Sequence, residues 1–282
     1  MTSIGYDDEG AGEALVLIHG HPFDRSMWRP QTDHFRRAGW RVIVPDLRGY
    51  GEHHAAAAPV TEKTTLETFV RDVVTLLDRL GVEHFVLGGL SMGGQIAMEF
   101  HRLFAARIRG MLLADTFAGA DTEEGRAVRR ATADRLLREG MSGYAHEVLT
   151  TMVSPRTVEA RPDVARHVLE MMTGTSPAAA AAALRGRAER RDYTDLLPHI
   201  TVPTLVVVGE EDAFTPVRDA ELIADRVPHS TLRVIARAAH LPNLEQPAEF
   251  NAALAEFLGS LPPGSPAPRP PRAALPPAQW AS

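Results

Sequence analysis

Short apolar runs of strand length alternate along this chain with segments of helical periodicity, and this alternation restricts the folds open to it more than any other feature. Residues 14–19 (ALVLIH) end at Gly20, for example, and residues 65–80 place apolar side chains at steps of three and four. Strands that alternate with amphipathic helices are typical of parallel sheets, because a helix connects each strand to the next. Strands are predicted at residues 14–19, 41–45, 84–90 and 111–115, with helices at 65–80 and 93–106.

The alternation stops after Asp115 and resumes near residue 204. Between these points the pattern is helical throughout and contains no convincing strand. We therefore predict an α/β fold with a mostly parallel central sheet of about seven strands flanked by helices, formed by residues 1–116 and 196–259, and a helical cap at 117–195. The further predicted elements are helices at 127–139, 143–153, 164–172 and 177–190, then a strand at 204–209, a helix at 217–227, a strand at 231–235 and a helix at 248–258.

Charge and composition exclude several classes of function. The 282 residues carry 30 basic and 36 acidic side chains without a dense basic segment, so no nucleic acid partner is expected. The absence of cysteine excludes disulfides, thiolate nucleophiles and cysteine-ligated metals. The first residues lack the pattern of a signal peptide, and no run of about 18 apolar residues occurs, so we expect a cytoplasmic protein without a membrane partner. Oligomeric state is left open.

Two other segments are interpreted without a catalytic role. Residues 260–282 are rich in proline and are predicted to form a disordered tail; a PxxP-type ligand for a partner domain is the alternative. His53 and His54 are adjacent, so their side chains point apart, and no carboxylate cluster or HExxH motif accompanies them. No metal site is predicted.

The motif with the clearest chemical meaning is G-x-S-x-G at residues 89–93 (GLSMG), between a predicted strand and a predicted helix. In this position a tight turn would present Ser91 at the start of a helix, where backbone N–H groups and the helix dipole stabilise negative charge. Ser91 is therefore the candidate nucleophile. The alternative is a glycine turn with an incidental serine.

A serine hydroxyl needs a base, and the base needs an orienting group. His240 is the candidate base among twelve histidines, because it follows the last predicted strand and so lies at the carboxyl edge of the sheet. Asp212 follows the strand at 204–209 and is the candidate acid, which gives the chain order Ser, Asp, His. Asp115, at the end of a neighbouring strand, is the alternative acid.

Several segments together resemble the α/β-hydrolase family, over a match that runs from about Ile4 to Leu258. Within that superfamily the motifs are most similar to a serine-nucleophile group of 3-oxoadipate enol-lactonases, small carboxylesterases and cofactor-free haloperoxidase-like perhydrolases. The full fold of the family has two strands in the part of the chain that corresponds to the start of this one, but only eighteen residues precede His19 here. We therefore expect one short strand near residues 4–6, with the outermost strand missing or abbreviated. The segments that carry the resemblance are residues 19–22 (HGHP), 46–51 (DLRGYG), 89–94 (GLSMGG), 209–212 (GEED) and His240.

The resemblance implies further roles around the candidate nucleophile. The backbone N–H groups of His21 and Met92 would form an oxyanion hole, and the bond between His21 and Pro22 is a candidate cis peptide. His19 is expected to brace the loop. Residues that match loop-shaping positions of the family, and that we interpret as structural, are Asp24, Trp28, Asp46 and Arg48.

The function that follows is cleavage of an ester or lactone of a small, largely apolar substrate through an acyl-enzyme, with no cofactor. One alternative is C–C bond hydrolysis or peracid formation by the same three residues. Another is a non-hydrolytic ligand-binding protein or cyclase on the same fold.

Two features of the predicted cap bear on the substrate. Apolar side chains of the cap are candidates to line the pocket, although packing within the cap is the alternative for each methionine. Arginines at helical spacing would favour an acidic substrate if they faced the pocket, but their spacing is more typical of a solvated helix face. The candidate lining residues are Phe117, Met141, Met152, Met171 and Met172, and the arginines are Arg126, Arg129, Arg130, Arg135 and Arg138.

The role given to His240 predicts a pH dependence. Only a neutral imidazole accepts the proton of Ser91, so hydrolysis should decline as mildly acidic solution protonates His240. Initial rates measured across the acidic range test this, and a profile that stays flat down to about pH 4 would contradict the assignment.

Overall fold

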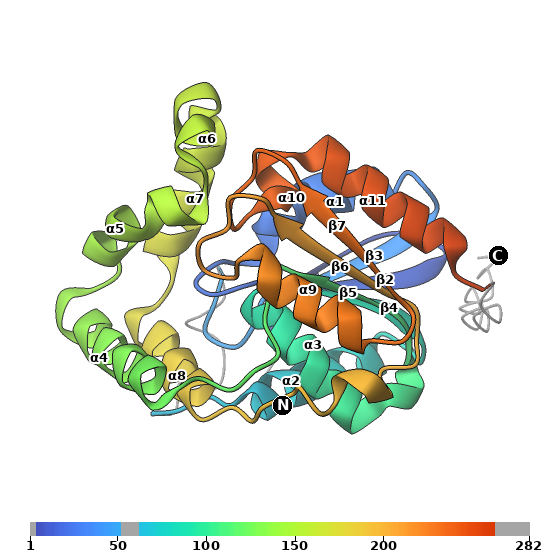
Figure 1. Ribbon diagram of the computed structural model, residues 1–282, viewed down its shortest axis with the longest axis horizontal. Coiled ribbons are helices and arrows are strands. Elements are labelled where there is room, and N and C mark those ends of the chain that lie inside the picture. Colours follow the sequence, from blue (N-terminus) through green and yellow to red (C-terminus); the bar gives the residue numbers. More distant parts are fainter. Residues whose placement is uncertain (1–3, 52–61, 263–282) are drawn as a thin grey trace, which may run out of the picture.

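A seven-stranded sheet with the order β1-β3-β2-β4-β5-β6-β7 forms the centre of the molecule (Figure 1). The computed structural model describes residues 4–51 and 62–262. All strands are parallel except β1, which pairs antiparallel with β3. The predicted α/β fold class, with a mostly parallel sheet flanked by helices, is confirmed. The strands are β1 (Tyr6–Gly10), β2 (Glu13–Ile18), β3 (Trp40–Pro45), β4 (Phe85–Leu90), β5 (Ile108–Ala114), β6 (Thr204–Gly209) and β7 (Ser230–Ile235).

The first strand lies later in the chain than the expected position at residues 4–6. It spans YDDEG, and Tyr6 is opposite Pro45 in β3. Its side chains are mostly polar and have no strand periodicity, so sequence pattern could not locate it. Backbone pairing with β3 holds the strand instead. A bidentate ion pair supports it, in which Arg41 donates to both carboxylate oxygens of Asp8 at 2.8 and 2.7 Å. Among the described residues, this is the one strand that precedes β2.

Helices cover both faces of the sheet, and the strands are therefore apolar on both sides. Successive side chains of β2 point to opposite faces. Val16 and Ile18 pack into the core beneath α2, α3 and α9, whereas Leu15 and Leu17 pack into the core beneath α1 and α11 (Figure 1). These helices are α1 (Arg29–Phe35), α2 (Leu66–Arg79), α3 (Met92–Phe104), α9 (Val217–Arg226) and α11 (Pro247–Ser260).

Helices fill the segment between β5 and β6, and no strand occurs within it. Figure 1 shows this segment beside the sheet, on the side toward which the parallel strands point. α4 and α8 pack together through a small apolar cluster of their own. The sequence pattern missed α6 and the later helix α10 (Pro242–Glu245), which are only six and four residues long and each begin with proline. The helices are α4 (Glu123–Glu139), α5 (Ser142–Met152), α6 (Pro155–Ala160), α7 (Pro162–Gly174) and α8 (Pro177–Ala188).

The predicted proline-rich tail beyond residue 262 and the pair His53 and His54 lie outside the described residues. No helix among residues 4–51 and 62–262 is long and apolar enough to cross a bilayer.

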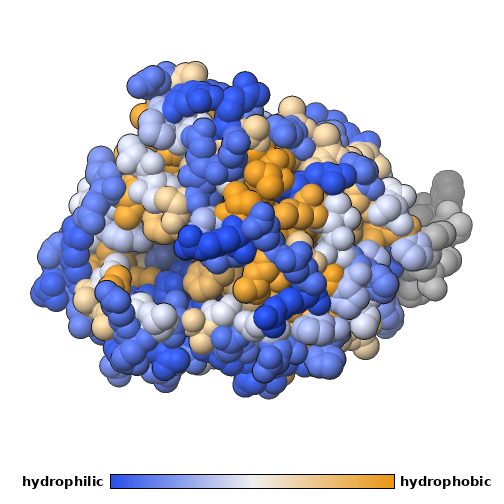
Figure 2. Space-filling view, in the orientation of Figure 1, coloured by the Kyte–Doolittle hydropathy of each residue, from blue (hydrophilic) through white to orange (hydrophobic). Residues whose placement is uncertain are grey.

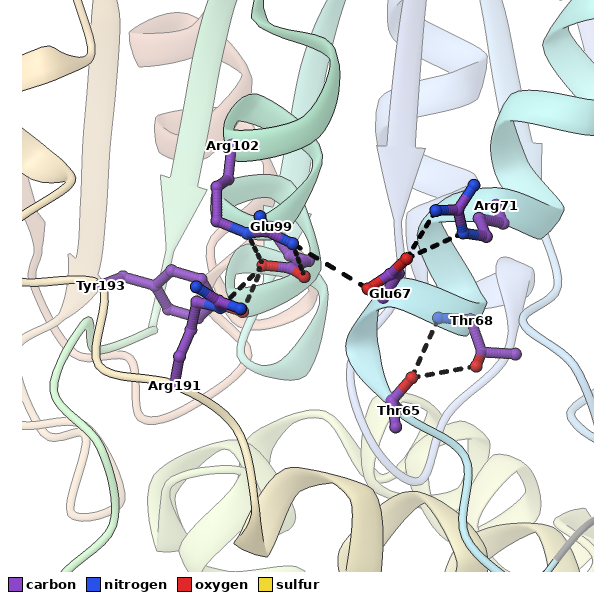
Figure 3. A network of polar contacts seen from close by, with 8 residues as sticks. All are labelled: Thr65, Glu67, Thr68, Arg71, Glu99, Arg102, Arg191 and Tyr193. Atoms are coloured by element: carbon purple, nitrogen blue, oxygen red, sulfur yellow. Dashed lines mark hydrogen bonds and ion pairs between the residues drawn. The ribbon is translucent and has the colours of Figure 1, made fainter.

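A buried carboxylate on α3 holds the chain where it returns from the helical segment to the sheet (Figure 3). Glu99 accepts hydrogen bonds from Nε and Nη2 of Arg102 at 2.9 and 2.8 Å and from the Tyr193 hydroxyl at 3.0 Å. Arg191 lies 3.8 Å from the same carboxylate, and Arg102 is 4.0 Å from Glu67 on α2. Burial and the Glu99 charge raise the pKa of Tyr193, so the phenol remains a donor.

Replacing Tyr193 with phenylalanine should lower the free energy of unfolding by about 1–2 kcal/mol, because the ring still fills its buried site but one bond to a carboxylate is lost. Urea denaturation measures this change. Tyr6→Phe is the matched control, since the Tyr6 hydroxyl makes no hydrogen bond to the described residues, and it should cost less than about 0.5 kcal/mol. Equal losses in the two variants would show that the Glu99 bond contributes nothing.

Candidate active site

Ser91 occupies a strained turn between β4 and α3. Its φ of 57° and ψ of −115° lie outside the regions that most residues adopt, at a cost of about 1–3 kcal/mol. The glycines on either side make the turn sterically feasible: a Cβ on Gly89 would lie 2.1 Å from the carbonyl oxygen of Gly93, and one on Gly93 would lie 2.2 Å from that of Ile18. The Ser91 N–H donates to Ala114 O at 2.9 Å. The end of β2 and the end of β5 thus hold the turn in place.

The loop after β2 lies directly against this turn. A Cβ on Gly20 would be 3.3 Å from Cβ of Ser91. His19 braces the loop as expected, because its Nε2 accepts the Leu47 N–H at 2.9 Å and its Nδ1–H donates to Gly20 O at 2.8 Å. The bond between His21 and Pro22 is cis, which confirms the prediction.

Two backbone N–H groups beside Ser91 lack an acceptor among the described residues. They belong to His21 and to Met92, the first residue of α3. The His21 side chain is buried, and its Nδ1 lies 2.8 Å from the Tyr50 hydroxyl. Burial and then the positive charge of Arg187 hold the pKa of His21 well below its ordinary value, so the ring is neutral. Backbone N–H groups without an acceptor are suited to bind an oxyanion, and that of Met92 also lies at a helix N-terminus.

His240 and Asp212 form a buried pair at the carboxyl edge of the sheet. The Nδ1–H of His240 donates to Oδ2 of Asp212 at 2.8 Å, and the two residues are 2% and 5% exposed. Oδ1 of Asp212 accepts the N–H groups of Phe214 and Thr215 at 2.8 and 3.1 Å, and the Thr215 hydroxyl donates to Oδ2. Burial favours the neutral acid, but the His240 charge and these hydrogen bonds outweigh it and lower the pKa of Asp212. Asp212 is therefore an anion that orients the imidazole.

The alternative acid, Asp115, lies beside this pair but does not bond His240. It is fully buried, its Oδ1 accepts the Gly209 N–H at 2.9 Å, and its Oδ2 has no partner among the described residues. Burial, followed by the Asp212 charge, raises the pKa of Asp115 well above its ordinary value. Ligand atoms of Asp115, Asp212 and His240 come within 4.8 Å of one another. A metal ion there would have to displace the bond between His240 and Asp212.

Glu245 supports the His240 loop, and sequence pattern gave no signal for it. Its Oε1 accepts the N–H of Ala239, the neighbour of His240, at 2.8 Å. Its Oε2 accepts the Ser154 N–H at 2.8 Å and the Thr157 hydroxyl at 2.6 Å. One carboxylate thus joins the loop after β7 to the start of α6, which are far apart in the sequence.

Most arginines of α4 are paired at the surface, as a solvated helix face predicts. Arg130 and Arg135, for example, contact glutamates at 2.8 and 2.9 Å. Arg129 instead turns inward, with Nε 2.6 Å from Oδ2 of Asp121. The same oxygen lies 2.8 Å from Nη1 of Arg190, whose guanidinium also stacks over the ring of Phe117 at 4.5 Å. The buried arginines of α8 and its C-terminal end could not be identified from the sequence, because an alanine-rich helix gives no sign of which arginine is buried.

Of the candidate lining residues, Phe117 lies under the guanidinium of Arg190, and the four methionines lie in two apolar clusters. Met141 packs between α4 and α8, whereas Met152, Met171 and Met172 belong to the core that continues into the sheet. Surface clefts of about 420 and 320 Å³ lie near α1 and α7, and Met171 borders the larger of these two, but neither is lined by Ser91, Asp212 or His240.

An exposed aromatic side chain lies beside His240. The centroid of the Phe214 ring is 5.2 Å from that of the imidazole, and Phe214 is 41% exposed. Figure 2 shows apolar side chains gathered over the central part of this face of the molecule.

Comparisons with known proteins show the family and the fold. A family model described as alpha/beta hydrolase fold matches residues 13–247. The 3-oxoadipate enol-lactonase 1 of Acinetobacter baylyi is 29% identical over 248 residues, which are 88% of this chain and 89% of that protein. A thermophilic esterase from Thermogutta terrifontis is 39% identical, with a TM-score of 0.87 over 91% of this chain and 93% of its own. The enol-lactonase from Burkholderia xenovorans LB400 is 26% identical, with a TM-score of 0.83 over 91% and 96%.

The raised pKa of Asp115 and the lowered pKa of Asp212 predict opposite effects of pH on stability. A carboxyl that stays protonated in the fold destabilises it as pH rises above the ordinary value, so Asp115→Asn should gain stability relative to the wild type by up to about 1.4 kcal/mol per pH unit. Asp212→Asn should instead lose stability relative to the wild type as pH rises through the ordinary carboxyl range. Denaturant unfolding from about pH 3 to 8 measures both. A difference for Asp115→Asn that is independent of pH would contradict its neutral state.

Proposed function

Because this chain belongs to the alpha/beta hydrolase fold family, we propose that it is a serine hydrolase that cleaves a carboxylic ester or lactone through an acyl-enzyme on Ser91. The observation that carries the proposal is the 2.8 Å bond between His240 and Asp212, at the same sheet edge as the strained turn of Ser91. A buried carboxylate that fixes Nδ1 leaves Nε2 of the imidazole to act as a base. The esterase and lactonase relatives support the same reaction class.

In the first step, the Ser91 oxygen attacks the carbonyl carbon while Nε2 of His240 takes the hydroxyl proton. The charge of Asp212 stabilises the imidazolium that forms, and the lowered pKa of Asp212 keeps this carboxylate ionised. The resulting tetrahedral oxyanion binds the N–H groups of His21 and Met92. Each such donor contributes about 3 kcal/mol to lowering the barrier. Because these groups have no acceptor in residues 4–51 and 62–262, they give up no hydrogen bond to that part of the chain when the oxyanion forms.

The imidazolium then returns its proton to the leaving alkoxide, and the ester C–O bond breaks. Water repeats the sequence on the acyl-enzyme: His240 takes a proton from water, the new hydroxyl group joins the carbonyl carbon, and Ser91 leaves with the proton. For a lactone, the leaving alkoxide stays attached to the acyl group, so a single hydroxy acid is released. Residues of the chain supply the nucleophile, the base and the oxyanion donors, and solvent supplies the water of the second step.

We further propose that residues 117–195 act as a cap over this site. Glu245 anchors the start of α6 to the His240 loop, and Phe117 immediately follows the strand-end segment that holds Ser91. The exposed Phe214 beside His240 adds apolar surface at the site. A small acyl group with an apolar portion fits these surroundings.

The test is hydrolysis of short-chain p-nitrophenyl esters and simple lactones by the wild type, Ser91→Ala and a matched control. We expect Ser91→Ala to lose at least about 1,000-fold in kcat, because no nucleophile remains. Ser142→Ala removes an exposed hydroxyl at the start of α5 and should stay within about twofold of the wild type. Equal turnover by the wild type and Ser91→Ala, or a folded wild type without turnover on the whole panel, would refute the proposal.

A further inference from the structure

Arg187 is a buried arginine that reaches toward the start of α3. It lies in the last turn of α8 and is 6% exposed. Its Nε donates to Oε1 of Gln95 at 3.1 Å, and the Gln95 N–H in turn donates to the carbonyl of Ser91 at 3.1 Å. The close approach of Gly186 to the backbone of Thr64 fixes this end of α8, since a Cβ on Gly186 would lie 1.8 Å from the Thr64 oxygen. Arg187 is thus held by Gln95, a residue one helical turn after the candidate nucleophile.

No carboxylate among the described residues forms an ion pair with Arg187. The nearest acid of this cluster, Asp121, is occupied by Arg129 and Arg190 at 2.6 and 2.8 Å. Two guanidinium groups therefore share one carboxylate, and the third, that of Arg187, is buried without an ion pair to the described residues. Burial and the charges of Arg129 and Arg190 lower the pKa of Arg187, as expected for a cation without a counter-charge. Burying such a charge is costly unless an anion joins it.

Further polar atoms near Arg187 are buried without partners. Nε2 of Gln95 is an amide donor with no acceptor among the described residues, and Nε2 of His21 has no partner either. In the tautomer in which Nδ1 of His21 accepts the Tyr50 proton, this Nε2 also carries a hydrogen. After burial, the Arg187 charge has the largest effect on the pKa of His21, and it lowers that pKa. These donors are suited to bind a negatively charged group.

We propose that Arg187, together with Gln95 and His21, binds a carboxylate of the substrate, so that the natural substrate is an ester or lactone that carries a carboxylate a short distance from the bond that is cleaved. This assignment rests on the function proposed above and adds the substrate class. A planar guanidinium binds both oxygens of a carboxylate. Because Arg129 and Arg190 are already held by Asp121, one free guanidinium matches a group of single negative charge better than a phosphate dianion.

The kinetic test compares acidic and neutral esters of similar length. The p-nitrophenyl monoesters of succinic, glutaric and adipic acid carry a carboxylate at three distances, and p-nitrophenyl pentanoate carries none. Arg187→Met keeps an unbranched side chain without the charge, and it should lower kcat/KM for the best acidic ester by about 10- to 100-fold, mainly through KM. The same substitution should change kcat/KM for the neutral ester by less than about threefold. Arg187→Lys keeps the charge but not the planar pair of N–H donors, so its kcat/KM for the acidic ester should lie between those of the wild type and Arg187→Met.

Arg191 provides the matched control, because it lies four residues further on and is half exposed beside Glu99 (Figure 3). Arg191→Met should leave the ratio of acidic to neutral kcat/KM unchanged. Equal losses on both esters in Arg187→Met would indicate a purely structural arginine and overturn the assignment. A wild type that shows no preference for any of the acidic esters would do the same.

Ligand binding separates this inference from the proposed function. Glutarate should raise the Tm of Ser91→Ala, which cannot turn over substrate, and should not raise that of the double variant with Arg187→Met. If glutarate binds through Arg187 while no ester is cleaved, the hydrolase proposal fails and the carboxylate site stands. If esters are cleaved but neither the binding of glutarate nor the cleavage of its monoester depends on Arg187, the carboxylate site is refuted and the hydrolase proposal stands. Stabilisation by inorganic phosphate in preference to glutarate would overturn the choice of a carboxylate.

Discussion

The close backbone packing that two glycines allow at the start of α3 is the constraint on which the rest of the site depends. Gly93 allows the first turn of α3 to lie against the backbone of Ile18, and Gly89 allows the chain to fold back on itself one residue after β4. A side chain at position 93 would push α3 away from β2, and one at position 89 would push α3 away from β4. The strained geometry of Ser91, the unpaired N–H of Met92 and the contact with the loop of His21 all follow from this close approach.

Burial then decides which charges the fold can keep. Asp212 and Asp115 lie side by side at the ends of neighbouring strands, but only Asp212 receives several donors, so it is ionised while Asp115 is neutral. The same principle applies on α8. Arg190 is compensated by Asp121, whereas Arg187 has a neutral amide as its partner. A buried cation beside a reactive turn is costly to the empty protein and favourable once an anion is bound.

Elements whose apolar residues show a clear periodicity could be predicted from the sequence. Elements that are short, or that form only through contacts with distant segments, could not. The strand at 204–209 was predicted with the bounds that the structure gives, because TLVVVG is continuously apolar and buried on both faces. β1 was misplaced because its polar residues form a strand only by pairing with β3. The short helices α6 and α10 have too few turns to show a period. The contacts of Glu245 and Arg187 could not be predicted, because these residues bond segments that are distant in the sequence.

Local sequence by itself determined the alternation of strands and helices, the turn around Ser91 and the edge of the sheet at which Asp212 and His240 lie, because each depends on periodicity or on glycine placed beside a strand end. Tertiary structure alone decided which of the two aspartates bonds His240, which arginine is buried without a carboxylate, and which residue joins the His240 loop to α6. These outcomes depend on distances between segments far apart in the chain and on the water that packing removes, and neither quantity is contained in any local pattern.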